Sequence, residues 1–167
     1  MPARSTVSLL ALSLIAVTGS AASAAAQRPV DSNPDVVEIR HYQLTMGKID
    51  NFVAATAALK KLADTDPSLN KQMNADKDDE TISQKAADWD LHFPQAAVVV
   101  RAHGLSTREY IVITMALIND VMVVGMKKQG AIKDYPPNAI TPENAAFVEQ
   151  NYDALQQKLG PLMGGGQ

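Results

Sequence analysis

The segment from Thr107 to Gln129 reads TREYIVITMALINDVMVVGMKKQ, and it decides the fold. Its stretch from Tyr110 to Met126 is apolar on nearly every side, which is typical of a helix surrounded by other helices. The many β-branched residues also permit a buried strand. We favour a helix because Ser106-Thr107-Arg108-Glu109 has the pattern of a capping box and because Gly130 stands where a helix commonly ends.

Other helix boundaries are marked in the same way. Leu44-Thr45 and Ile140-Thr141 each place an apolar residue before a hydroxyl group that can cap the free N–H groups of a helix start. Gly104 and Gly160 are expected to end helices, and Pro161 is expected to prevent the last helix from continuing.

Apolar residues recur at helical spacing in three further segments. Pro94 ends or kinks the second of these, and a shorter helix is expected from there to about His103. We therefore predict an all-α fold, a bundle of four to five helices around a central apolar helix at about 107–129. The three apolar faces are formed by Ile49, Phe52, Thr56, Leu59 and Ala63; by Ile82, Ala86, Trp89 and Phe93; and by Val148, Tyr152, Leu155 and Leu159.

The first 26 residues have the three-part build of a secretory signal peptide. A charge-free run follows Arg4, with an apolar centre VSLLALSLIAV and then small residues up to Ala26. After residues 1–26, the sequence predicts an extended N-terminal arm at 27–43, with a short strand or helical turn possible at 35–41. A helical bundle domain is expected at 44–160 and a flexible tail at 161–167.

Composition narrows the class of protein. The 167-residue chain contains no cysteine, which excludes disulfides, thiolate metal sites and cysteine nucleophiles. Its net charge of −3, without a basic cluster, argues against nucleic acid as a partner. An exported protein without disulfides is typical of bacteria, so we expect the periplasm or secretion. A transmembrane segment in the mature chain is not expected, because Asn119 and Asp120 fall in the middle of its most apolar helix.

The helix-start and helix-end signals together resemble those of a group of small uncharacterised secreted bacterial helical proteins. The resemblance rests on Leu44-Thr45, Phe93-Pro94, the run from Gly104 to Tyr110 and the run from Ile140 to Val148. It implies a helical fold and export. It implies no activity, so it assigns no functional residue.

Metal-binding patterns in the chain are weak. Asp88, Asp90 and His92 could meet at a helix end, although a surface helix terminus is the simpler interpretation. The acidic run 74–80 lacks the glycine and the bidentate glutamate that a calcium loop needs. The run is therefore expected to be a solvated loop.

Three methionines of the central segment could in principle be axial ligands of haem or copper. Methionine fills gaps in apolar cores far more often, and the facing long helices carry no histidine. We therefore expect no cofactor at Met115, Met122 and Met126.

Asn119 and Asp120 are the most unusual pair, since they interrupt an otherwise apolar helix. A buried polar pair must find hydrogen-bond partners. The expected partners of Asp120 are Arg101, Arg108 or a tyrosine hydroxyl. We favour a structural role for Asp120 over a role in binding.

The sequence favours a non-enzymatic domain of the bacterial cell envelope that acts by binding a protein or a small apolar ligand between its helices. The alternative is a metal- or cofactor-binding helical bundle that uses Asp88, Asp90, His92 or the central methionines. An oligomer is compatible with either hypothesis.

Overall fold

The computed structural model describes residues 33–66, 69 and 80–163, and over these residues it contains six helices and no strand. The prediction of an all-α fold is confirmed at this level. The predicted signal peptide at 1–26 and residues 164–167 lie outside the described residues. The helices are α1 (Pro34–His41), α2 (Met46–Thr65), α4 (Ile82–His92), α5 (Pro94–Ala102), α6 (Thr107–Lys128) and α7 (Pro142–Met163).

Side-chain caps fix where α2, α4 and α6 begin. The Thr45 hydroxyl accepts a hydrogen bond from the backbone N–H of Lys48 at 3.3 Å. Ser106 accepts one from the N–H of Glu109 at 3.0 Å. Thr81 begins α4 with a complete capping box. Each cap satisfies an N–H group that has no partner within its own helix.

Helix α1 occupies residues for which the sequence favoured an extended arm. Asn33 accepts a hydrogen bond from the N–H of Asp35, and Pro34 stands at the first helical position. The residues that suggested a turn are thus a helix start, since Asn, Pro and Asp serve both purposes. The Asp35 carboxylate also accepts from the N–H of Ile82 at 2.9 Å and so joins α1 to the start of α4.

Helix α7 runs three residues beyond Gly160, which was expected to end it. Pro161 lies inside the last turn of α7, and Leu162 packs against the main apolar core. A proline so close to a helix end breaks few hydrogen bonds, and the burial of Leu162 favours the extra turn. The predicted tail at 161–167 therefore begins with helix.

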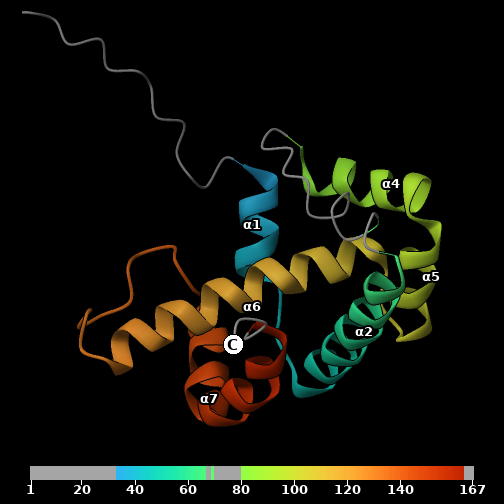
Figure 1. The fold of residues 1–167 in the computed structure, drawn as a ribbon. Coiled ribbons are helices and arrows are strands. Elements are labelled where there is room, and N and C mark those ends of the chain that lie inside the picture. Colours follow the sequence, from blue (N-terminus) through green and yellow to red (C-terminus); the bar gives the residue numbers. More distant parts are fainter. Residues whose placement is uncertain (1–32, 67–68, 70–79, 164–167) are drawn as a thin grey trace, which may run out of the picture.

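Helix α6 contacts all five other described helices. Figure 1 shows it crossing the middle of the molecule, with α7 below it, α1 above it, and α2, α4 and α5 gathered around its amino-terminal half. Its fully buried side chains, among them Ile113, Leu117 and Val124, form the centre of the core.

Among the described residues, α6 is also the one helix long and apolar enough to span a membrane. More than half of its most apolar 18-residue window, 56%, is buried inside the protein. The core helix of a globular protein has the same length and composition.

Candidate functional site

One face of α6 is left uncovered by the other helices. Met115, Ile118, Met122 and Met126 lie on it, and between 37% and 57% of each residue is exposed. Their spacing of three or four residues places them in one row along the helix. We call this row the methionine face. The sequence predicted a helix enclosed on every side, and this face is the exception.

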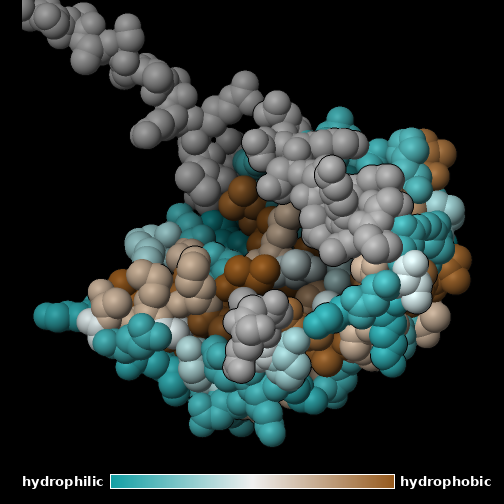
Figure 2. Space-filling model, viewed as in Figure 1, coloured by the Kyte–Doolittle hydropathy of each residue, from teal (hydrophilic) through white to brown (hydrophobic). Residues whose placement is uncertain are grey.

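Three residues of the methionine face, Ile118, Met122 and Met126, form a wall of a groove between α2, α6 and α7. The groove has a volume of about 600 Å³ and is lined by Phe52 from α2 and by Tyr152 and Leu159 from α7, in addition to residues of α6. Figure 2 shows apolar surface along the middle of this view, over α6, with hydrophilic surface around it. Grooves of this size and lining are typical of sites for small apolar ligands.

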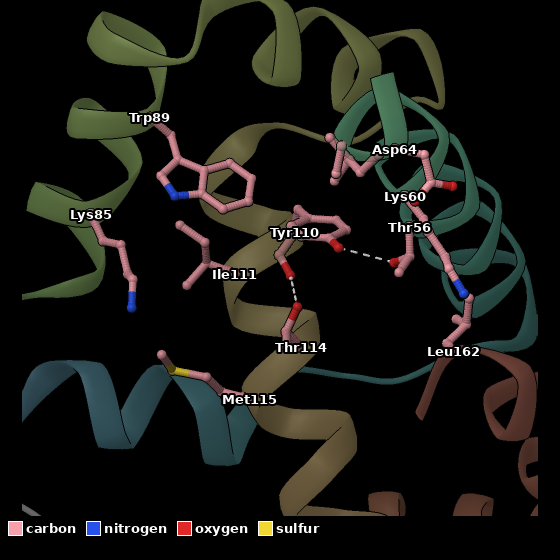
Figure 3. Close-up of a pocket in the computed structure, with 12 residues that line it drawn as sticks. Thr56, Lys60, Asp64, Lys85, Trp89, Tyr110, Ile111, Thr114, Met115 and Leu162 are labelled. Carbon is pink, nitrogen blue, oxygen red and sulfur yellow. Dashed lines mark hydrogen bonds between the residues drawn. The ribbon is translucent and has the colours of Figure 1, made fainter. Parts of the chain in front are cut away.

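A second cavity of about 510 Å³ adjoins the groove on the side of α4. The two share Thr56, Tyr110, Thr114 and Leu162 in their linings, so they meet at Tyr110. We call the second cavity the lysine cavity, because Lys60 from α2 and Lys85 from α4 line it. Figure 3 shows these two side chains on opposite sides of the cavity, with the ring of Tyr110 between them.

Tyr110 is held firmly where the two cavities meet. Its ring centroid lies 5.1 Å from that of Phe52 and 5.9 Å from that of Trp89. Its hydroxyl lies 3.0 Å from the hydroxyl of Thr56, as the dashed line in Figure 3 marks. Burial raises the pKa of Tyr110 above its ordinary value. The phenol therefore stays neutral at physiological pH and offers a polar contact where the two cavities meet.

Tyr152 lines the groove farther along, where α6 and α7 approach each other closely. A Cβ atom placed on Gly125 would lie 2.8 Å from the Tyr152 hydroxyl oxygen, closer than such atoms come in proteins. Glycine at this position therefore makes room for the tyrosine. The Lys128 ammonium lies 4.9 Å from the centroid of the same ring.

Asp120 points away from the groove, into a buried polar network. It is 1% exposed, and its carboxylate accepts hydrogen bonds from the side-chain amides of Asn119 at 2.9 Å and Asn144 at 2.9 Å. The partners suggested by the sequence, Arg101, Arg108 or a tyrosine, are wrong. Arg101 binds Asp90, and Arg108 binds Glu38 and Ser83.

Asn144 is the centre of this network and was not singled out from the sequence. It is 2% exposed, its amide also donates to the backbone carbonyl of Tyr42 at 2.8 Å, and its carbonyl oxygen accepts from the N–H of Leu44 at 3.2 Å. The amide of Asn119 reaches the backbone carbonyl of Ala139 at 2.8 Å. The network thus joins α6, the start of α7 and the segment between α1 and α2.

Burial raises the pKa of Asp120 to about 6, although its hydrogen bonds with Asn119 and Asn144 act in the opposite direction. No cation compensates the charge in the network. Asp120 binds Asn144 of α7 and its neighbour Asn119, whose amide in turn reaches the loop before α7, and none of the three residues lines either cavity. The network therefore holds the fold together.

The three residues proposed as weak metal candidates do not converge. Asp88 and His92 contact each other, with 2.8 Å between Oδ1 and Nδ1. Asp90 instead accepts hydrogen bonds from Arg101 at 3.0 Å and Thr107 at 2.7 Å. Within the described residues, no three histidine, aspartate or glutamate side chains come together in a way that could hold a metal ion.

The central methionines were expected to fill gaps in the core, and the structure places them elsewhere. Met115, Met122 and Met126 are exposed and line the groove or the lysine cavity. Only the relative positions of α2 and α7 reveal this, because the same sequence pattern would suit a buried helix. No family model, curated protein or solved structure matches this chain.

Proposed function

We propose that this protein is a binding domain without catalytic activity, and that it holds an elongated apolar ligand in the groove along the methionine face. The observation that carries the proposal is the row of four exposed apolar side chains, three of which form a wall of a cavity of about 600 Å³ while Met115 lines the adjoining cavity. Large apolar side chains gathered in one exposed row typically mark a binding surface.

In this proposal the fold is a bundle packed around α6, and α2 and α7 form the other walls of the site. Methionine suits such a site because its flexible, polarisable side chain adapts to ligands of different shape. A groove lined by methionine would accept apolar chains of different shape.

The energies are sufficient for useful affinity. Completing the burial of four half-exposed apolar side chains contributes on the order of 4 kcal/mol. Each ligand methylene that leaves water adds about 0.8 kcal/mol, so that ten give roughly 8 kcal/mol. After at least about 4 kcal/mol is lost to restricted motion, a dissociation constant in the micromolar range remains.

We further propose that the protein works outside the cytoplasm, in the bacterial periplasm or after secretion. The support is the charge-free apolar run and the small residues within residues 1–26. Intact-mass analysis of the protein from the producing cell's extracytoplasmic fraction tests this. A chain that begins near Gln27 supports the proposal, and an uncut chain retained in the cytoplasm contradicts it.

Titration calorimetry with 1-dodecanol tests ligand binding. The natural protein should bind with a dissociation constant in the micromolar range and a negative change in heat capacity. Ile118→Gln should weaken binding at least fivefold, because it places an amide on the methionine face. Val98→Gln is the matched control, since Val98 is equally exposed, at 58% against 52%, and lines neither cavity.

Two results would contradict the proposal. One is no measurable heat of binding for 1-dodecanol or any other neutral single-chain compound. The other is a stable dimer in native mass spectrometry that Ile118→Gln dissociates and Val98→Gln does not. The second result would assign the methionine face to a protein–protein interface.

A further inference from the structure

The groove and the lysine cavity adjoin each other. They share four lining residues around Tyr110, and both lie along α6. From Tyr110 to Met126 the helix extends about 24 Å, at 1.5 Å per residue. A ligand that lies on the methionine face therefore reaches the lysine cavity at one end.

The two ends of this site differ in charge. Lys60 and Lys85 line the lysine cavity, and neither forms a hydrogen bond or an ion pair with a side chain of the described residues. The other lysines near the site are already engaged: Lys127 binds Glu149, and Lys128 lies over the Tyr152 ring. Unpaired ammonium groups beside an apolar groove are available to a ligand.

Among the described residues, Asp64 is the one carboxylate that lines the same cavity. The two ammonium groups and this carboxylate give the described part of the lining a net charge of +1. Trp89, Ile111 and Met115 form an apolar part of the wall around these charges. Opposite charges attract each other, so the excess of ammonium groups favours an anion over a cation.

The lysine side chains also suit the position. Their methylene stems can lie along the apolar wall while each ammonium group stays hydrated until it meets a ligand. Lys85 is partly buried and Lys60 is exposed, so a headgroup that pairs with either would remain in contact with solvent.

We infer that the ligand is a single-chain amphiphile with an anionic headgroup, a long-chain carboxylate, whose chain lies on the methionine face and whose carboxylate lies in the lysine cavity, where it pairs with Lys60 or Lys85. This inference rests on the proposed function and adds the headgroup and its direction in the groove. It predicts that charge at one end of the site, and not apolar contact alone, sets ligand preference.

Calorimetric titration with sodium dodecanoate and 1-dodecanol at pH 8 tests the inference, because the two ligands share a chain and differ in headgroup. Lys60→Met/Lys85→Met should weaken dodecanoate binding five- to tenfold and change dodecanol binding less than twofold. Lys61→Met is the matched control, since Lys61 belongs to the same helix and lines neither cavity. It should leave the affinity for both ligands unchanged.

A second variant tests the sign of the charge effect. Asp64→Asn removes the carboxylate that the described residues contribute to the cavity and should tighten dodecanoate binding two- to fivefold without affecting dodecanol. Raising the salt concentration should weaken dodecanoate binding to the natural protein, because salt screens partly exposed charges.

The outcomes separate the two proposals. If dodecanol binds and the lysine substitutions weaken both ligands equally, the anionic headgroup is wrong and the apolar site stands. Preference for dodecyltrimethylammonium over dodecanoate would also overturn the inference. If neither dodecanol nor dodecanoate binds, the proposed function itself fails.

Discussion

Asp120 is a carboxylate that the fold buries without a cation, and this makes stability depend on pH. Its pKa is about 6 in the folded protein, against an ordinary value of 3.8. The folded state therefore holds its proton more tightly than the unfolded chain does. The contribution of Asp120 to stability is full below about pH 4 and is lost as the pH rises through 6.

We expect this loss to be on the order of 2–3 kcal/mol between pH 4 and pH 7. Urea unfolding of the natural protein and of Asp120→Asn across this range measures it. The variant should lack this part of the pH dependence. An asparagine at position 120 can accept only one of the two hydrogen bonds, so the variant loses stability at every pH. The quantity to compare is therefore the slope of the free energy of unfolding against pH. Parallel slopes in the two proteins would contradict the assignment.

Asn144 should matter more to stability than Asn119, although both bind Asp120. Asn144→Ala leaves the Tyr42 carbonyl, the Leu44 N–H and one oxygen of Asp120 buried without partners. We expect a loss of about 3 kcal/mol. Asn119 is only partly buried, so water can replace its amide, and Asn119→Ala should cost about 1 kcal/mol. Chemical denaturation of the two variants measures these losses of stability. Equal losses would show that Asn144 is not the centre of the network.

At this scale the sequence shows that Asp120 is unusual and does not show what it binds. A charged residue within an apolar helix requires partners wherever the helix lies. The partner, Asn144, lies 24 positions away in the first turn of α7. There it has the sequence environment of an exposed helix start, and only the packing of α7 on α6 buries it.

At the scale of the helices, Gly125 and Tyr152 set the distance between α6 and α7. Alanine is favoured over glycine in a helix by about 1 kcal/mol. Gly125→Ala should nevertheless destabilise the natural protein by about 1 kcal/mol, because its methyl group would collide with the Tyr152 hydroxyl. In the background of Tyr152→Phe, which lacks that oxygen, the same substitution should stabilise. Free energies of unfolding of the natural protein, the two single variants and the double variant give the coupling energy between positions 125 and 152. Additive effects of the two substitutions would contradict the contact.

Helix starts are predictable from the sequence wherever the cap is local. Thr45 and Ser106 each bind an N–H three residues ahead, so a short pattern contains the whole interaction. Helix α1 could not be predicted in this way, because Asn33 and Pro34 suit a turn as well as a helix start. Its contacts with α6, including the Glu38–Arg108 ion pair, connect residues 70 positions apart.

For the molecule as a whole, the candidate site could not be predicted from the sequence. The apolar pattern of α6 indicates burial on all sides, and it does not reveal which side its neighbours leave open. The groove depends on how α2 and α7 are placed beside α6, and Tyr110 and Tyr152 both line it. Composition and helix signals are sufficient to predict the all-α class. Predicting the site requires knowing how the helices pack against one another.

An open apolar groove should make the ligand-free protein bind the fluorescent dye ANS while it is still folded. Saturating 1-dodecanol should displace the dye, and at a free concentration one hundred times its dissociation constant it should stabilise the fold by about 2.7 kcal/mol. Dye fluorescence and thermal unfolding measure the two effects. Ile118→Gln should reduce both, and Val98→Gln should reduce neither. Dye binding that dodecanol leaves unchanged would place the dye outside the groove.

The hydrogen bonds of Asn144 also fix the order in which the chain can reach its final form. They join position 144 to positions 42 and 44, which are about a hundred residues earlier. A ribosome delivers the chain from its amino terminus, so the segment between α1 and α2 must wait for α7 before its backbone groups are satisfied. The protein therefore completes this part of its fold only after α7 has emerged, and a chain that crosses a membrane amino terminus first would lack these hydrogen bonds until α7 has followed.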